Sequence, residues 1–222
     1  MRAMLVEPPK DVWFIMGGYL PPPYGLIQLG AYLEREVKDV EIEVIDCNAQ
    51  HLDWRNMEER IRSFKPDIVA SSSLATCNTY VVVRTLETAK RVNPNILTVT
   101  GGQHFTATAQ ESLVEYPDID VIVRGEGEET FAELAADVEN KNAFSRINGI
   151  SFRHNGKIVH NPPRPLIENL EDLPYPGYHL VRDFVHKYHF VMMAGRNAPY
   201  VLIEGARGCP HECVFCTQWK HW

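Results

Sequence analysis

The sequence predicts an α/β protein built on a doubly wound, parallel, five-stranded sheet. Short apolar runs rich in valine and isoleucine alternate with longer segments of helical periodicity, and this alternation is typical of βαβ units. The runs are apolar along their whole length, as expected of strands that helices cover on both faces. We expect these five strands at residues 3–7, 41–46, 67–73, 96–101 and 120–124.

The segments between the expected strands carry apolar residues at helical spacing. Leu26, Leu29, Leu33 and Val37 recur every three or four residues, which predicts a helix after the first strand. The same spacing predicts a helix between the third and fourth strands and another after the fifth. These two helices are indicated by Val82, Leu86 and Ala89, and by Phe131, Leu134, Ala135 and Val138. Right-handed crossovers then predict the strand order 2-1-3-4-5 of a flavodoxin-like sheet, within the wider Rossmann-like class.

The residues after about position 145 change in character. Asn155-Gly156 separates two short alternating runs, at residues 150–153 and 157–160, and predicts a β-hairpin. Five prolines between residues 162 and 176 then predict an extended connector. Beyond it we expect a short helix near residues 179–186 and strands near residues 190–194 and 199–204.

These changes divide the chain into three parts. Residues 1–145 form the α/β domain, residues 146–198 form the hairpin and connector, and residues 199–222 form the first strand and loop of a further domain. A β/α barrel needs on the order of 200 residues. We therefore expect that the chain holds only the start of such a barrel and is a fragment of a longer protein.

Composition disfavours several classes of function. The chain has 222 residues, 45% hydrophobic and 23% charged, which is ordinary for a soluble globular protein. The net charge is −7 and no basic stripe is present, so no nucleic-acid partner is expected. The apolar run at the N-terminus is too short for a signal peptide, and no stretch approaches the ~20 apolar residues of a transmembrane segment. We expect a cytoplasmic protein whose thiols stay reduced.

Three cysteines near the C-terminus indicate a metal centre. Cys209, Cys213 and Cys216 have the spacing C-x3-C-x2-C. Three thiolates leave one iron of a [4Fe–4S] cluster without a protein ligand, since such clusters are usually held by four cysteines. The alternative is zinc, with His211 or His221 completing a Cys3His set. Structural zinc sites usually combine two close ligands with two distant ones, so the clustering of all three cysteines favours iron–sulfur over zinc.

The loops after the strands indicate a second ligand. Ligands of doubly wound sheets bind at the carboxyl ends of the strands, where this chain carries hydroxyl groups and paired glycines suited to a large polar ligand. Neither G-x-G-x-x-G after the first strand nor a P-loop motif is present, which disfavours dinucleotides and P-loop nucleotides. The candidate binding residues are Ser71, Ser73 and Thr76, then Gly101, Gly102, Gln103 and His104, and then Gly125, Glu126 and Gly127.

Both sites resemble those of one enzyme group. The cysteine spacing, with Phe215 as the aromatic residue, resembles the cluster loop of the radical S-adenosylmethionine (SAM) enzymes. Gly101-Gly-x-His104, Arg124-Gly-Glu-Gly-Glu128 and Leu170-Glu-Asp-Leu-Pro174 resemble the cobalamin-binding domain that precedes many radical SAM cores. The resemblance implies cobalamin, SAM and a [4Fe–4S] cluster as cofactors. It also implies that Cys209, Cys213 and Cys216 bind the cluster, whose open iron chelates SAM for reductive cleavage to a deoxyadenosyl radical.

One departure from the wider cobalamin-binding family affects the cobalt. The D-x-H-x-x-G motif, whose histidine ligates cobalt from below in methyltransferases and mutases, is absent. The lower axial ligand is therefore unassigned, and His104 is a candidate only by its position. A hydrogen bond from His104 to the corrinoid or to backbone is the alternative that we favour. No catalytic residue is assigned beyond the cluster ligands.

The opening residues narrow the resemblance further. Glu7-Pro-Pro-Lys10 and Pro21-Pro-Pro-Tyr-Gly25 resemble the anaerobic magnesium-protoporphyrin monomethyl ester cyclases. This implies oxidative cyclisation of a tetrapyrrole substrate, with flavodoxin or ferredoxin as the electron donor. Three alternatives stay open: a cobalamin-dependent radical SAM methyltransferase, a corrinoid-binding module without catalysis, and a zinc-stabilised α/β interaction domain.

Overall fold

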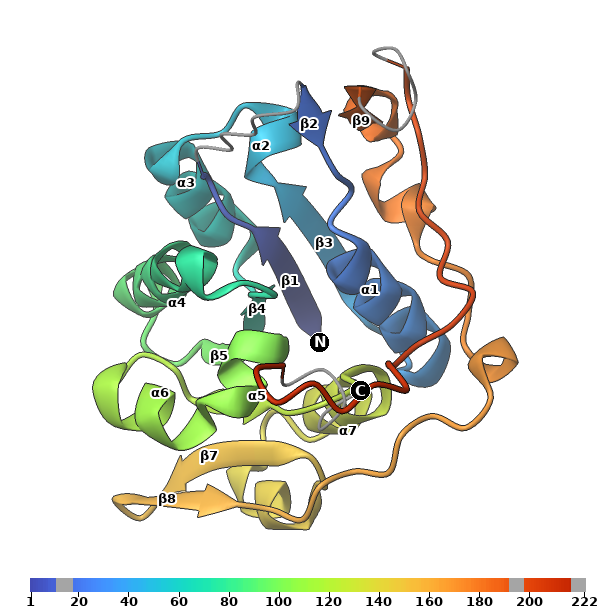
Figure 1. Cartoon of the computed structure of the whole chain (residues 1–222). Helices are drawn as coiled ribbons and strands as arrows, with labels where there is room; N and C mark the ends of the chain where they lie inside the picture. The colour runs from blue at the N-terminus through green and yellow to red at the C-terminus, as the bar shows by residue number, and fades with distance from the viewer. Residues whose placement is uncertain (11–17, 192–197, 217–222) are drawn as a thin grey trace.

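The parallel strands predicted from the apolar runs are present and lie in the predicted order. The structure is a computed structural model that describes residues 1–10, 18–191 and 198–216. The main sheet has the order β3-β1-β4-β5-β6-β7-β8, and its first five strands are parallel (Figure 1). In order of sequence these are β1 (Arg2–Glu7), β3 (Glu41–Asp46), β4 (Ile68–Ser72), β5 (Leu97–Gly101) and β6 (Val121–Val123).

Helices cover both faces of the parallel strands, which explains why those strands are apolar throughout. Alternate residues of β1 enter different cores: Ala3 and Leu5 join one cluster, and Met4 and Val6 join the other. The first cluster lies under α1 (Tyr24–Glu36) and α7 (Glu128–Ala136). The second lies under α3 (Trp54–Phe64), α4 (Thr79–Val92), α5 (Gln103–Ala107) and α6 (Ala109–Glu115). Shorter helical segments are α2 (Cys47–Gln50), η1 (Thr76–Asn78) and η2 (Lys141–Arg146).

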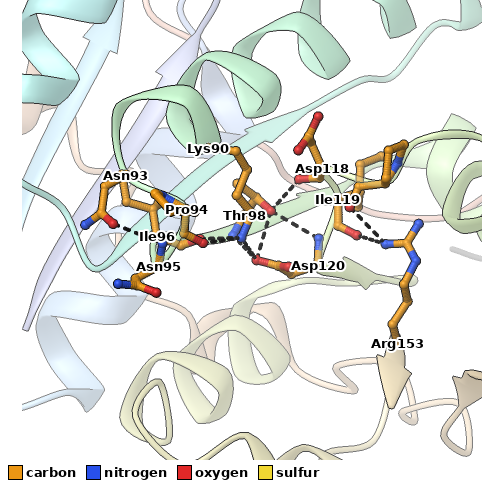
Figure 2. A network of polar contacts seen from close by, with 11 residues as sticks. Lys90, Asn93, Pro94, Asn95, Ile96, Thr98, Asp118, Ile119, Asp120 and Arg153 are labelled. Carbon is orange, nitrogen blue, oxygen red and sulfur yellow. Dashed lines mark hydrogen bonds and ion pairs between the residues drawn. The ribbon is translucent and has the colours of Figure 1, made fainter. Parts of the chain in front are cut away.

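The predicted hairpin forms, but it extends the main sheet instead of standing apart from it. Strand β7 (Ile150–His154) pairs antiparallel with β6 and with β8 (Lys157–His160), so the sheet has seven strands where five were expected. Phe152 is buried in the first core cluster. The Arg153 guanidinium donates to carbonyl oxygens at the end of α6 and in the loop between α6 and β6, including that of Ile119 at 2.5 Å (Figure 2). Burial and these hydrogen bonds fix the hairpin at the sheet edge.

The connector returns over α1 through short turns. It contains the 3₁₀ segments η3 (Leu170–Asp172), η4 (Tyr178–Val181) and η5 (Val185–Lys187), where one short helix near residues 179–186 was expected. The Gln28 side chain donates to the Pro174 carbonyl at 3.0 Å, and the Gly177 amide donates to the Ile27 carbonyl at 3.1 Å. The connector is thereby fastened along the helix that covers the first core cluster.

The strands expected after the connector form only in part. Strand β9 (His189–Phe190) pairs with β2 (Tyr19–Leu20), and the rest of the strand expected at 190–194 lies largely outside the described residues. The expectation of a strand at 199–204 is wrong: Pro199 makes an isolated bridge, and residues 200–204 belong to no strand. The Leu202 amide instead donates to the Tyr178 hydroxyl at 2.6 Å. A side chain therefore satisfies a backbone group that would bond to a neighbouring strand in a sheet.

None of the helices within the described ranges combines the length and the apolar character needed to cross a bilayer.

Candidate functional site

Two buried hydroxyl groups lie near the carboxyl ends of the central strands. Ser71 of β4 and Thr100 of β5 are neighbours in register and lie on the same face of the sheet. Their residues are 1% and 2% exposed. Neither hydroxyl oxygen has a hydrogen-bond partner among the described residues. A buried polar group without a partner costs about 1–3 kcal/mol, so a polar ligand atom that reaches these oxygens is favoured.

Glycines allow the loops above these hydroxyls to approach one another closely. Gly102 has a φ of +88°, and a Cβ there would lie 2.5 Å from the Ser73 carbonyl oxygen. A Cβ on Gly101 would lie 2.9 Å from the Val123 carbonyl oxygen. Both distances are too short for a side chain, so these positions require glycine. The Ser73 hydroxyl itself donates to the Ala75 carbonyl at 2.6 Å and closes its own loop.

The structure brings His104 and Thr76 together at this edge. The Thr76 hydroxyl lies 3.1 Å from Nδ1 of His104, and the Thr108 hydroxyl lies 3.5 Å from Nε2. Burial lowers the pKa of His104, which favours the neutral imidazole. A neutral ring can accept a hydrogen bond or ligate a metal ion. Gln103 lies beside His104 in α5, as its position in the sequence implies.

The loop after β6 is held by contacts with several other segments of the protein. The Gly125 amide donates to the Thr106 hydroxyl at 3.1 Å, and a Cβ on Gly127 would lie 3.1 Å from Leu29. Glu126 was expected to contact a cofactor. Its Oε2 accepts from the Ile167 amide at 2.6 Å and its Oε1 accepts from Arg207 at 3.1 Å. Glu126 therefore uses both oxygens within the protein.

The three cysteines lie at the end of the described chain. Cys209 and Cys213 are exposed and Cys216 is half-buried, with the Cys216 amide donating to the Cys213 carbonyl at 3.0 Å. Within residues 1–10, 18–191 and 198–216, no three His, Cys, Asp or Glu side chains are grouped so that they could hold a metal ion. His221, the second zinc-ligand candidate, lies outside the described residues. The cysteine ligand set stays a prediction.

A buried carboxyl group lies at the carboxyl end of β3, and the sequence pattern did not indicate it. Asp46 caps α2 by accepting from the Asn48 and Ala49 amides through Oδ1, at 3.0 Å each. Its Oδ2 and the Tyr188 hydroxyl are both buried, and the Tyr188 hydroxyl interacts with the Asp46 carboxylate. Burial raises the pKa of Asp46 to about 6, and the charge of Glu7 raises it further while the capping amides and the Tyr188 hydroxyl lower it.

Two other residues of this edge were missed from the sequence. Thr100 was treated only as a residue of the strand expected at 96–101. The sequence shows two threonines at alternate positions, and it does not show which hydroxyl has a hydrogen-bond partner. Arg207 lies two residues before Cys209, yet its guanidinium binds Glu126 and Glu128 about eighty positions earlier in the sequence. An arginine between glycines and next to the cysteines was a signal that could have been used.

Known proteins similar in sequence are about twice as long or longer. An uncharacterized methyltransferase of Pyrococcus horikoshii is 37% identical over 218 residues, which is 98% of this chain and 45% of that protein. The anaerobic magnesium-protoporphyrin IX monomethyl ester cyclase of Rubrivivax gelatinosus is 36% identical over 205 residues, which is 90% of this chain and 36% of that protein. The chain therefore spans less than half the length of these curated relatives.

A solved structure shares the fold. The cobalamin-dependent S-adenosylmethionine radical enzyme OxsB, with aqua-cobalamin and S-adenosylmethionine bound, matches with a TM-score of 0.71 and 19% identity. The match covers 97% of this chain and 28% of that chain. The family described as the B12 binding domain matches residues 13–135, which is more than half of the sequence. The chain therefore belongs to the B12-binding domain family, and its relatives include anaerobic cyclases.

Proposed function

We propose that this chain is the cobalamin-binding part of a cobalamin-dependent radical SAM enzyme and carries the cysteines of its [4Fe–4S] cluster. The observation that carries the proposal is the pair of unpartnered hydroxyls of Ser71 and Thr100, beside loops that require glycine, in a B12-binding domain. The C-x3-C-x2-C run on the same chain extends the proposal from corrinoid binding to radical chemistry.

The residues at the carboxyl ends of the central strands fit a corrinoid. Ser71 and Thr100 would donate to or accept from its polar groups, beside loops whose close approach requires glycine at positions 101 and 102. His104 would face it as a neutral imidazole, because burial lowers its pKa. Thr76 and Thr108 hold the ring of His104 by hydrogen bonds to its two nitrogens and so fix its orientation.

The cysteines fit an iron–sulfur cluster by their donor type and spacing. Cys209 and Cys213 are exposed, so their thiolates can reach a cluster without rearrangement of a packed core. When bound, the three cofactors supply a corrinoid cobalt centre and a source of a deoxyadenosyl radical by one-electron cleavage of SAM. We place the protein in the cytoplasm, where thiols remain reduced, with flavodoxin or ferredoxin as the electron donor.

The reaction that we favour is oxidative cyclisation of a magnesium-porphyrin monomethyl ester. It is supported by the 36% identity to the Rubrivivax gelatinosus cyclase and by the proline-rich opening residues. Methyl transfer is the second candidate, because the Pyrococcus horikoshii relative is described as a methyltransferase. A corrinoid-binding module without catalysis is the third, since the chain spans less than half of either relative.

Anaerobic reconstitution with iron, sulfide and cobalamin tests the proposal. The chain is expected to bind one cobalamin and about four irons, as a cubane cluster requires. Combined Cys209→Ser, Cys213→Ser and Cys216→Ser substitutions should abolish iron binding and leave cobalamin bound. Cys77→Ser is the matched control, because Cys77 is exposed but lies outside the motif. Stoichiometric zinc without colour, or iron that survives the triple substitution, contradicts the cluster.

Substrate class is tested on the same reconstituted protein. Magnesium-protoporphyrin monomethyl ester is titrated into it, and a shift of the porphyrin Soret band is expected if a tetrapyrrole is the substrate. SAM is then added with a chemical reductant, and deoxyadenosine and methionine are measured. Cobalamin binding without SAM cleavage would favour the non-catalytic module for this chain.

A further inference from the structure

Arg207 is bound by three carboxylates, two of them buried. Its Nη2 lies 2.6 Å from Glu128, its Nη1 lies 3.1 Å from Glu126, and its Nε lies 2.7 Å from Glu204. The side chain of Arg207 is 12% exposed, and those of Glu126 and Glu128 are 6% exposed. A planar guanidinium with fixed donors suits several carboxylates at once, whereas an ammonium group offers a single point charge.

This contact joins parts of the chain that are far apart in sequence. Glu126 lies in the loop after β6, Glu128 begins α7, and Arg207 lies two residues before Cys209. Figure 1 shows the C-terminal segment, in red, running past α1 toward α7. The other oxygen of Glu126 accepts from the Ile167 amide of the connector at 2.6 Å. One carboxylate therefore fastens both the connector and the segment that carries the cysteines.

The arginine also offsets part of the negative charge that Glu126 and Glu128 bury. Removal of one partner of a buried ion pair leaves an uncompensated charge, which is strongly destabilising. Burial lowers the pKa of Arg207, but the hydrogen bonds and charges of Glu128, Glu204 and Glu126 outweigh burial and raise it.

We propose that Arg207 is a positioning residue that docks the cysteine segment, residues 199–216, onto the loop after β6. The proposal rests on the proposed function in one respect: docking sets the separation between a cluster on the cysteines and a corrinoid at the sheet edge. Arg207 touches neither group itself. It acts through Glu126 and Glu128, whose positions are fixed by the connector and by the start of α7.

Hydrogen exchange measured on the chain without cofactors tests the docking. Two backbone amides of the cysteine segment report it: Tyr200, which donates to the Tyr188 carbonyl at 3.2 Å, and Leu202, which donates to the Tyr178 hydroxyl. Arg207→Gln is expected to accelerate their exchange about tenfold. Arg207→Lys should give an intermediate exchange rate, because lysine keeps the positive charge but lacks the planar set of N–H donors of the guanidinium. It also keeps the test available if the glutamine variant does not fold.

Arg164→Gln is the matched control. Arg164 is similarly buried and binds two carboxylates of the same helix, Glu129 and Glu133, but it belongs to the connector. Its substitution should leave exchange at Tyr200 and Leu202 unchanged. Equal acceleration by the two substitutions would mean that α7 loosens as a whole, and unchanged exchange in Arg207→Gln would mean that the segment is held by other contacts. Either result overturns the proposal.

Paramagnetic resonance on the reconstituted protein tests the consequence of docking. The reduced cluster should broaden the cob(II)alamin signal of the wild type, and Arg207→Gln should weaken this coupling while iron and cobalamin contents stay the same. Coupling in that variant equal to the wild type overturns the positioning role. A wild type that binds neither cofactor contradicts the proposed function instead, and exchange at Tyr200 and Leu202 still decides the docking.

Discussion

Two threonines of β5 lie on the same face of the sheet, and their hydroxyl groups have opposite environments. Thr98, toward the amino end of the strand, donates to the Asp118 carbonyl at 2.6 Å and lies 3.1 Å from the Asp120 carboxylate. Thr100, toward the carboxyl end, has no partner among the described residues. Both residues are almost completely buried. Burial and residue type are equal, so the difference comes from which edge of the sheet each threonine approaches.

The amino edge is a closed polar network, as Figure 2 shows. Lys90 pairs with Asp120 and donates to the Ile96 carbonyl at 2.7 Å. The Asp120 carboxylate also accepts from the Thr98 amide at 3.0 Å. Each of these groups satisfies another, so this network stabilises the fold.

The carboxyl edge has the opposite character. Ser71 and Thr100 each place a buried hydroxyl there without a partner in the described chain. Parallel sheets bind their ligands at this edge. Among the described residues, unsatisfied hydroxyl oxygens therefore mark the ligand edge, whereas satisfied ones mark the structural edge.

Gly102→Ala should cause the largest loss of stability among the substitutions at the two edges. The φ of +88° with a ψ of 176° is a conformation for glycine alone, and the new Cβ would overlap the Ser73 carbonyl. We expect the free energy of unfolding to fall by roughly 3–5 kcal/mol, measured by urea denaturation. Gly156→Ala is the control, because its φ is also positive while nothing lies within 4 Å of a Cβ there. An equal loss at both positions would show that close approach at the edge is unimportant.

Asp46→Asn should remove a pH dependence from the carboxyl edge. Burial raises the pKa of Asp46 from 3.8 to about 6 in the folded state, so folding favours the protonated form. Protonated Asp46 contributes roughly 3 kcal/mol to the free energy of unfolding. This contribution is fully present below about pH 4 and is lost as the pH rises through about 6. Asparagine keeps the cap on α2 and cannot ionise, so the variant should gain stability relative to wild type across this window.

Urea denaturation at several pH values measures this difference. The matched control is Asp53→Asn, because Asp53 also caps a helix but is exposed. A stability difference between Asp46→Asn and wild type that stays constant from pH 4 to pH 6 would contradict the burial of an ionisable carboxyl group.

Asp120→Ala should weaken the amino edge without affecting ligand binding. The substitution leaves the ammonium of Lys90 and the amide of Thr98 without their carboxylate partner. Because both side chains of the ion pair are partly exposed, we expect a loss of roughly 2 kcal/mol in stability. Cobalamin affinity, measured by absorbance titration below the unfolding temperature, should stay within about twofold of wild type. A larger change in affinity would show that the two edges are coupled.

Valine substitutions of Thr98 and Thr100 should have the smallest effects on stability, and the two effects should differ. Thr98→Val removes hydrogen bonds that are made and should cost about 1–2 kcal/mol, whereas Thr100→Val removes a hydroxyl without a partner and should be neutral or slightly stabilising. Their effects on cobalamin affinity should be reversed, with about a tenfold loss for Thr100→Val and none for Thr98→Val. Equal stability losses, or equal affinities, would remove the distinction between the edges.

Local patterns predicted much of this architecture. The five parallel strands and their order follow from apolar runs and from the handedness of crossovers. The turn at Asn155-Gly156 has positive φ at both residues, as its type requires. Glu128 and Glu129 lie in the first turn of α7, where the helix dipole favours them.

Other expectations failed because partners distant in sequence changed the outcome. Residues 200–203 are apolar and were expected within a strand at 199–204, but the backbone amide and carbonyl of Leu202 both hydrogen-bond to the Tyr178 hydroxyl. The hairpin was assigned to the connector, but β6 offered it a free edge. The expectation that Glu126 contacts a cofactor stays a prediction, and the structure adds that Arg207 and the Ile167 amide bind its oxygens.

The sequence by itself determined the five parallel strands, the helices α1, α4 and α7 and the glycines at the strand ends, because periodicity and backbone conformation depend on near neighbours in the chain. The tertiary structure alone decided which hydroxyl of β5 lacks a partner and which carboxylates hold Arg207. Hydrogen bonds and ion pairs form only between groups that the topology brings within about 3 Å. That proximity depends on the path of the whole chain.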